Sequence, residues 1–98
     1  MITRVTLFKW KPGCTQDQIA EVFKDAMDLK KHIPNCNFEL RCGKNVGKDP
    51  DGGFTHIIVG TFDNHATLAV YQDHPAHVAV VDKIVKIRQD YLLLQMET

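Results

Sequence analysis

The spacing of hydrophobic residues in this chain changes from every second residue to every third or fourth, and the change occurs more than once. A period of two is typical of a strand with one buried face, and a period near 3.6 is typical of an amphipathic helix. In chain order, the patterns predict a strand over residues 2–11, a helix over 15–33, strands over 36–42 and 54–62, two short helices on either side of Pro75, and a strand over 91–96. The chain must therefore combine helices and strands around one core.

The helix boundaries carry their own signals. Thr15 followed by Gln18 forms a capping box, and Pro34 ends the first helix. Residues 63–64 cap the second helix, and Pro75 interrupts it because proline lacks the amide proton that a helix interior needs. Pro75 then suits the first turn of the third helix, which we expect to turn four side chains inward: Val78, Val81, Ile84 and Val85.

The second strand, the loop after it and the cysteines give further expectations. Residues 36–42 alternate so that Cys36, Phe38, Leu40 and Cys42 share the core face. Residues 43–53 are rich in glycine and polar side chains, which predicts a loop long enough to be mobile or to cover something. With Cys14, the chain has three cysteines in all and no Cys-x-x-Cys pair. An odd number without that motif argues against a disulfide framework or a zinc ribbon. We expect three buried thiols and a reducing compartment.

The β-α-β-β-α-β order predicts an α+β fold of the ferredoxin-like type, with four antiparallel strands and the helices on one face. The patterns over 2–11, 54–62 and 91–96 are apolar on both faces, so the sheet face without helices would expose hydrophobic side chains to water. Two sheets packed face to face would bury them. We therefore expect one domain over residues 1–98 that assembles as a symmetric homodimer, a dimeric α/β barrel.

The charge balance limits the partners. Twelve Lys and Arg residues balance twelve Asp and Glu residues, and no run of basic residues interleaves with aromatic ones. A nucleic-acid or anionic membrane surface therefore has no electrostatic basis. The first residues lack the basic and then apolar layout of a signal peptide, so we expect a cytoplasmic protein.

The segment from Tyr71 to His77 concentrates two histidines, a tyrosine and an aspartate around the helix break. One interpretation makes His77 a general base, because imidazole titrates near working pH, and makes Tyr71 a hydrogen-bond donor to a carbonyl oxygen. In the other interpretation, one histidine caps the third helix and the other is a satisfied packing residue. In the first case, burial should lower the pKa of His77 among the side chains of Phe23, Val78 and Val80.

Other kinds of site find less support. A metal site on His74 and His77 lacks further ligands fixed by a motif, apart from Asp73. Residues 43–49 contain glycine and lysine, but they lack the spacing of a phosphate-binding loop and open no helix. The chain contains no serine, which excludes hydrolysis by a serine–histidine pair. We expect neither a metal nor a cofactor.

Arg4 and Thr6 share one face of the first strand with Phe8 and Trp10. If that face lies under the helices, it offers a cation and a hydroxyl among aromatic rings, which could orient a carboxylate or an enolate. Alternatively, Arg4 lies at the end of the sheet and extends its charged group into water.

Four segments of the chain carry a family pattern: residues 5–13 (VTLFKWKPG), 29–34 (LKKHIP), 52–56 (GGFTH) and 71–77 (YQDHPAH). In this order, and with these elements, the chain resembles the stress-responsive dimeric α/β-barrel (Dabb) family. The resemblance runs essentially end to end. It implies the same ferredoxin-like dimer as the hydrophobic pattern.

Within that family, the chain is similar to plant polyketide cyclases, which use a histidine and a tyrosine in an apolar cavity without a metal or cofactor. The resemblance assigns these roles to His77 and Tyr71. It implies a cavity lined by Thr6, Phe8, Val22, Phe23, Ala26, Ile58, Val78 and Leu93. Two positions depart from the cyclase pattern, because Arg4 stands in place of a histidine and Ala26 in place of a tyrosine, so the substrate need not be the same.

These features together predict a homodimer that binds a small, largely apolar carbonyl compound, either neutral or anionic. The reaction implied by the resemblance is a cofactor-free aldol-type cyclisation or a related lyase step. The alternative is a stress-responsive structural or ligand-binding protein without chemistry.

Overall fold

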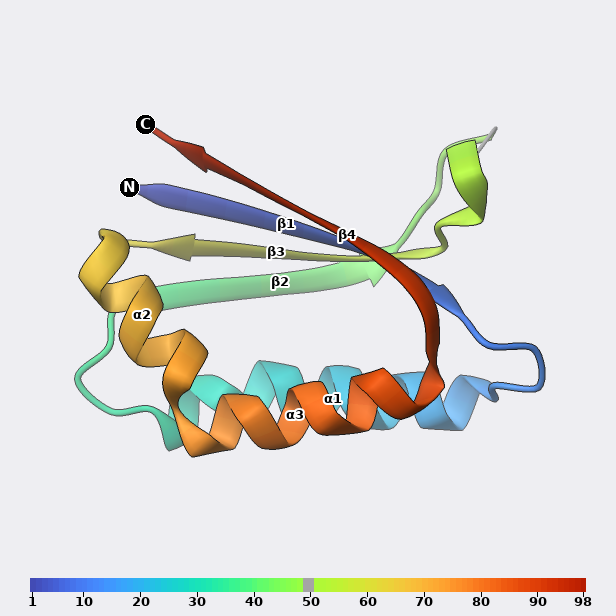
Figure 1. Cartoon of the computed structure of the whole chain (residues 1–98), viewed down its shortest axis with the longest axis horizontal. Helices are drawn as coiled ribbons and strands as arrows, with labels where there is room; N and C mark the ends of the chain where they lie inside the picture. The colour runs from blue at the N-terminus through green and yellow to red at the C-terminus, as the bar shows by residue number, and fades with distance from the viewer. Residues whose placement is uncertain (49–50) are drawn as a thin grey trace.

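The computed structural model describes residues 1–48 and 51–98 of the chain. Figure 1 shows a sheet of four strands above a layer of helices. In chain order, the elements are β1 (Ile2–Trp10), α1 (Gln16–His32), β2 (Phe38–Lys44), the short 3-10 turn η1 (Asp51–Gly53), β3 (His56–Phe62), α2 (His65–Asp73), α3 (Pro75–Ile87) and β4 (Arg88–Glu97). None of the described helices is long and apolar enough to span a membrane.

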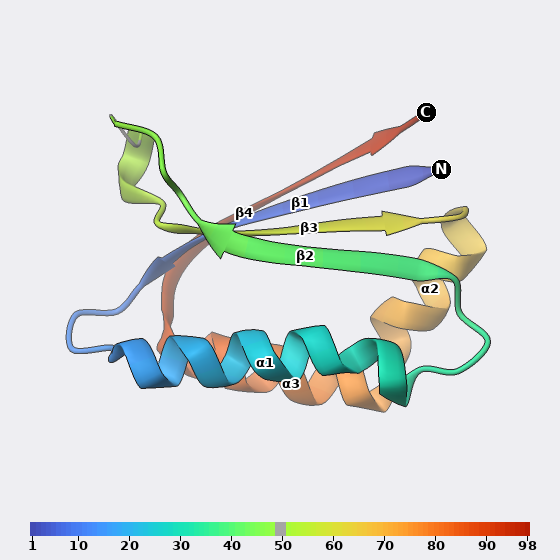
Figure 2. The same ribbon diagram turned by 180° about the vertical axis from the view of Figure 1, so that it is seen from behind.

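The strands are antiparallel and follow the order β2-β3-β1-β4 across the sheet. All three helices lie on one face, and α1 and α3 run side by side beneath the strands (Figure 1, Figure 2). This arrangement is the ferredoxin-like α+β fold that the sequence predicts. The strand of residues 56–62 lies inside the sheet, as its two apolar faces indicate.

The predicted helix caps are all present. The Thr15 hydroxyl accepts from the Gln18 amide at 3.2 Å, and the Gln18 side chain accepts from the Thr15 amide at 2.9 Å. The Asn64 side chain accepts from the amide of Thr67 and opens α2. Each helix therefore begins where its own local sequence satisfies the free amide groups of the first turn.

The two faces of the sheet differ in what covers them. Ile2 and Phe8 point from β1 toward the helices and are buried. Between them in the chain, Val5 and Leu7 point the other way, and their partners on the neighbouring strands are also apolar. We call the resulting patch the outer sheet face: Val5, Leu7, Ile57, Val59, Leu92 and Leu94. In the described part of the chain no helix covers it (Figure 2).

The prediction for the inward side of α3 is partly wrong. Val78, Val81 and Ile84 line the space between α3 and the sheet, as predicted. Val85 is instead 46% exposed, and Val80, which was not predicted, is buried. Because α3 packs against α1 as well as facing the sheet, its buried stripe is turned toward α1.

Three strands start two or three residues away from the predicted position, and in two of them a side chain near the start takes part in a turn. Asn37 donates to both carboxylate oxygens of Asp63 at 2.8–2.9 Å, so β2 begins only at Phe38. The Phe54 carbonyl accepts from the Asn45 side chain, and β3 begins at His56. The last strand is longer than predicted and runs from Arg88 to Glu97.

The prediction of three buried thiols is wrong for two of them. Only Cys36 is buried, while Cys14 is half-buried and Cys42 is exposed on the edge strand β2, which has a neighbour on one side only. The loop after β2 includes residues 49–50, which lie outside the described residues. Its described part stands with η1 on the side of the sheet away from the helices (Figure 1, Figure 2), so it does not cover the helix-facing side.

Candidate functional site

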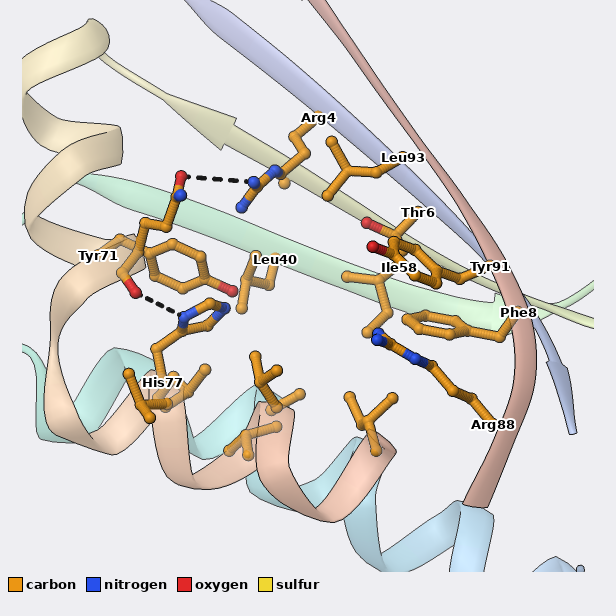
Figure 3. Close-up of a pocket in the computed structure, with 18 of the residues that line it drawn as sticks. Arg4, Thr6, Phe8, Leu40, Ile58, Tyr71, His77, Arg88, Tyr91 and Leu93 are labelled. Carbon is orange, nitrogen blue, oxygen red and sulfur yellow. Dashed lines mark hydrogen bonds between the residues drawn. The ribbon is translucent and has the colours of Figure 1, made fainter. Parts of the chain in front are cut away.

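A cavity of about 360 Å³ lies between the inner face of the sheet and the helices. Figure 3 shows side chains from the strands and from α2 and α3 converging on it. Its volume is at the lower end of the range of roughly 300–1,000 Å³ that is usual for small-molecule sites. The cavity therefore has the size of a binding site for a small compound.

Most of the site residues predicted from the sequence line this cavity: Arg4, Thr6, Phe8, Ala26, Ile58, Tyr71, His77, Val78 and Leu93. Two others lie elsewhere. Val22 is in the buried core, and the Phe23 ring packs against the rings of Trp10 and His56. The expected packing of His77 against Phe23 is therefore wrong.

Tyr71 lies in the last turn of α2, and its ring is buried against two aromatic side chains of the sheet. Ring centroids are 5.0 Å apart for Phe38 and 4.9 Å apart for Phe62. Burial raises the pKa of Tyr71 to about 12, and the positive charge of Arg4 opposes that rise only in part. The phenol therefore stays protonated at physiological pH and can donate a hydrogen bond.

His77 lies in the first turn of α3, with its ring centroid 4.3 Å from that of Tyr71. Its Nδ1 is 3.0 Å from the backbone carbonyl oxygen of Gln72, as the dashed line in Figure 3 shows. Because a carbonyl oxygen only accepts, Nδ1 must carry the proton and Nε2 the free lone pair. The hydrogen bond therefore selects the tautomer in which Nε2 can act as a base.

The protonation state of His77 follows from its surroundings. Burial lowers its pKa, the hydrogen bond to Gln72 raises it, and the nearby Arg4 charge lowers it further. Since the net change is downward from an ordinary value of 6.5, the ring is neutral at physiological pH.

His74 has a different role. Its Nδ1 accepts from the amide of Ala76 at 3.0 Å, so it caps α3, as one of the two interpretations of this segment predicted for a histidine. Pro75 occupies the first position of the helix, where no amide donor is needed. Among the residues that the structure describes, no group of three His, Cys, Asp or Glu side chains could hold a metal ion.

Arg4 points under the helices rather than into water at the end of the sheet, and it lies beside the Tyr71–His77 pair (Figure 3). One of its amino groups, Nη2, donates to the Gln72 side chain over 3.4 Å, while its buried Nε has no hydrogen-bond partner in the described part of the chain. Burial lowers the pKa of Arg4, but an arginine side chain remains charged in proteins.

Several lining residues are not predicted by the sequence patterns, above all Arg88, Tyr91 and Gln72. The Arg88 guanidinium carbon lies 3.9 Å from the centre of the Tyr91 ring. Its place depends on a shift in the β1–β4 register near Trp10, which no local motif signals. The carbonyl of Gln72 reaches His77 only through the helix break, so a sequence pattern gives no sign of it either.

Residues 2–97 match the stress responsive A/B barrel domain family (Dabb). The chain belongs to this family. Among the relatives of this Dabb protein, olivetolic acid cyclase of Cannabis sativa is 34% identical over 82 residues, which is 83% of this chain and 80% of the relative. A stress-response A/B barrel domain-containing protein of Arabidopsis thaliana is 32% identical over 78 residues, which is 79% of this chain and 71% of the relative.

Several solved structures share the fold of this Dabb protein. A crystal structure of an Arabidopsis thaliana protein has a TM-score of 0.88 and 26% identity, covering 100% of this chain and 95% of that one. A protein from Thermobifida fusca described as dimeric and ferredoxin-like has a TM-score of 0.84 and 27% identity, covering 99% and 90%. Hydroxynitrile lyase from Passiflora edulis, at 20% identity over 97% and 90% of the chains, shares the fold with a TM-score of 0.86.

Proposed function

We propose that this Dabb protein binds a small, largely apolar carbonyl compound and catalyses a cofactor-free aldol-type cyclisation or a related lyase step. The observation that carries the proposal is the pairing of Tyr71 with a His77 ring whose tautomer is set by the Gln72 carbonyl. A neutral base and a protonated donor then lie side by side on one cavity wall. This arrangement suits proton removal from the carbon next to a carbonyl group.

In the cyclisation, Nε2 of His77 removes an acidic proton from the carbon next to the substrate carbonyl. The electron pair moves onto the carbonyl oxygen, and the Tyr71 hydroxyl donates a hydrogen bond to the resulting enolate. The enolate carbon then attacks a second carbonyl carbon of the same molecule and forms the ring bond. His77 returns its proton to the new alkoxide, so the enzyme ends the cycle unchanged.

The named relatives support both chemical classes to different degrees. One is called a cyclase and is 34% identical, while the lyase shares only the fold. The alternative, a stress-associated binding protein without turnover, finds support in the name of the Arabidopsis relative. The free thiols of Cys14, Cys36 and Cys42 support a cytoplasmic location.

The test measures turnover of a linear diketone that can close to a ring and of an aromatic cyanohydrin. We expect His77→Ala to abolish turnover and Tyr71→Phe to lower kcat about 100- to 1,000-fold, which is the usual effect of losing one donor to a developing oxyanion. The rate should also fall in acid as His77 becomes protonated. The control is His32→Ala, which changes an exposed histidine in the last turn of α1. Full activity of folded His77→Ala would reject the proposed role of His77.

A further inference from the structure

Positive charge gathers in the cavity although the chain as a whole is neutral. Arg4 and Arg88 both line it, and no acidic side chain of the described residues does so. Neither arginine takes part in an ion pair within the described residues, where the ion pairs instead involve lysines and His65. The two cations therefore face the cavity without a compensating anion from the chain.

The hydrogen-bonding capacity of Arg4 is largely unused. Its Nε is buried without a partner, and its contact with the Gln72 amide oxygen is long, at 3.4 Å. A buried donor without a partner destabilises the folded protein, and a bound ligand that accepts a hydrogen bond from it would remove this penalty. The planar fork of a guanidinium matches the two oxygens of a carboxylate, which makes a carboxylate the fitting acceptor.

Arg88 supplies the second cation, on the other side of a group of apolar side chains (Figure 3). The face of the Tyr91 ring supports its guanidinium at 3.9 Å, which orients the group but leaves its in-plane donors available. Arg4 lies on β1, and Arg88 pairs with Trp10, which is six residues further along the same strand. At about 3.3 Å per residue, the two backbone positions are roughly 20 Å apart.

We propose that the cavity binds a dicarboxylate, with one acid group on Arg4 beside Tyr71 and His77 and the other on Arg88. The separation of the arginines and the side chains of Thr6, Ile58 and Leu93 between them require an apolar chain or ring between the two acid groups. This inference rests on the proposed function for the location of the site and names the substrate class. A carboxylate on Arg4 would place the neighbouring carbon atoms next to His77. For His77 to remove a proton there, the dicarboxylate substrate must also carry a ketone or aldehyde carbonyl beside that carbon, because a carboxylate alone does not make it acidic enough.

The test is calorimetric titration of the intact protein at neutral pH with three ligands of equal length: suberate, its half-amide suberamate and octanoate. We expect suberate to bind at least about tenfold more tightly than either, because each arginine gains one charged partner. These comparisons need no variant and so do not depend on a variant's folding.

Arg4→Gln and Arg88→Gln should each remove the preference for suberate over suberamate. Arg41→Gln is the matched control, because Arg41 is the remaining arginine and lies exposed on β2, outside the cavity. Equal affinities for suberate and octanoate, or a preference that survives both cavity variants, would overturn the inference. His77→Ala should still bind suberate, so the loss of turnover and the loss of dicarboxylate binding are separate outcomes.

Discussion

His77 and His56 both have lowered pKa values, but they respond differently to protonation. His56 is buried in β3, and its Nδ1 accepts from the indole N–H of Trp10 at 2.8 Å. Adding a proton to that nitrogen would place two donors opposite each other and break the hydrogen bond to Trp10, leaving the Thr55 hydroxyl, at 2.8 Å, to accept from Nδ1. On His77, by contrast, the hydrogen bond to Gln72 survives protonation because Nδ1 is already the donor.

Acid should therefore weaken the fold through His56. Burial, followed by the charge of Lys44, lowers its pKa below the ordinary 6.5, so below that pH the unfolded chain binds more protons than the folded one. The free energy of unfolding should be highest above pH 6.5 and fall as the pH falls below it. Urea unfolding followed by the fluorescence of Trp10, the single tryptophan, measures this change.

A His56→Gln variant should lose part of this pH dependence, because the glutamine oxygen can accept from Trp10 without titrating. The exposed His32 offers the matched change, and His32→Gln should keep the parent's pH profile. An identical pH profile in the parent and in His56→Gln would contradict the assignment.

The residues of the cavity divide into those that a motif marks and those that only the fold brings in. Tyr71 and His77 could be predicted because Pro75 marks the helix break between them in the sequence. Arg4 could be predicted because it shares one face of the first strand with Phe8. Arg88 and Gln72 could not be predicted. Their contacts depend on strand register and on one backbone carbonyl, which do not leave a local pattern.

The junction of α2 and α3 fixes the angle at which His77 meets Tyr71. His74 ends one helix and caps the next with an extended backbone, at φ −66° and ψ 135°. This conformation is the one that a residue before proline favours. The junction is therefore a structural support for the cavity wall, although its own side chains stay outside the proposed chemistry.

Replacing this cap should cost stability. His74→Ala removes the acceptor for the Ala76 amide and should lower the free energy of unfolding by about 1 kcal/mol. His74→Asn should restore most of the loss, because asparagine is among the best capping residues. Urea unfolding of the parent and the two variants measures these free energies. An alanine variant as stable as the parent would show that the cap does not contribute to the stability of the fold.

The starts of the first two helices could be predicted from the sequence, because the capping groups of Thr15 and Asn64 lie within three residues of their partners. The buried side of α3 could be predicted only in part, since the exposure of Val85 and the burial of Val80 depend on packing against α1. Strand ends fall between these cases. Asn37, for example, lies outside β2 because its side chain donates to Asp63, which is 26 residues away in sequence.

The assembled protein should be a dimer that buries the outer sheet face. Leu92 and Leu94 of this face are 47% and 61% exposed in the single chain, and similar solved structures are described as dimeric ferredoxin-like proteins. We expect a dimeric mass by light scattering at micromolar concentration and a Tm that falls on dilution. Leu94→Glu should give a monomer, because it would bury a charge between two sheets.

The control for this experiment is Val70→Glu. Val70 is 53% exposed but lies on α2, away from the outer sheet face, so this variant should remain dimeric. A monomeric parent, or a Leu94→Glu variant that still associates, would reject the face-to-face arrangement.

The pairing of β1 with both β3 and β4 has a consequence for the order in which the molecule can be completed. Ile2 pairs with Phe62 and with Glu97, which both lie far from it in the sequence. The first strand can therefore be fully paired only after both of these later strands have formed. Contacts of such separation form slowly, and β4 is the last of these elements to leave the ribosome. A chain that stops before Arg88 would expose β1 as an open edge and would lack Arg88, Tyr91 and Leu93 from the cavity. Incomplete synthesis should thus yield an inactive, aggregation-prone chain that cellular quality control must degrade, and not a partly active protein.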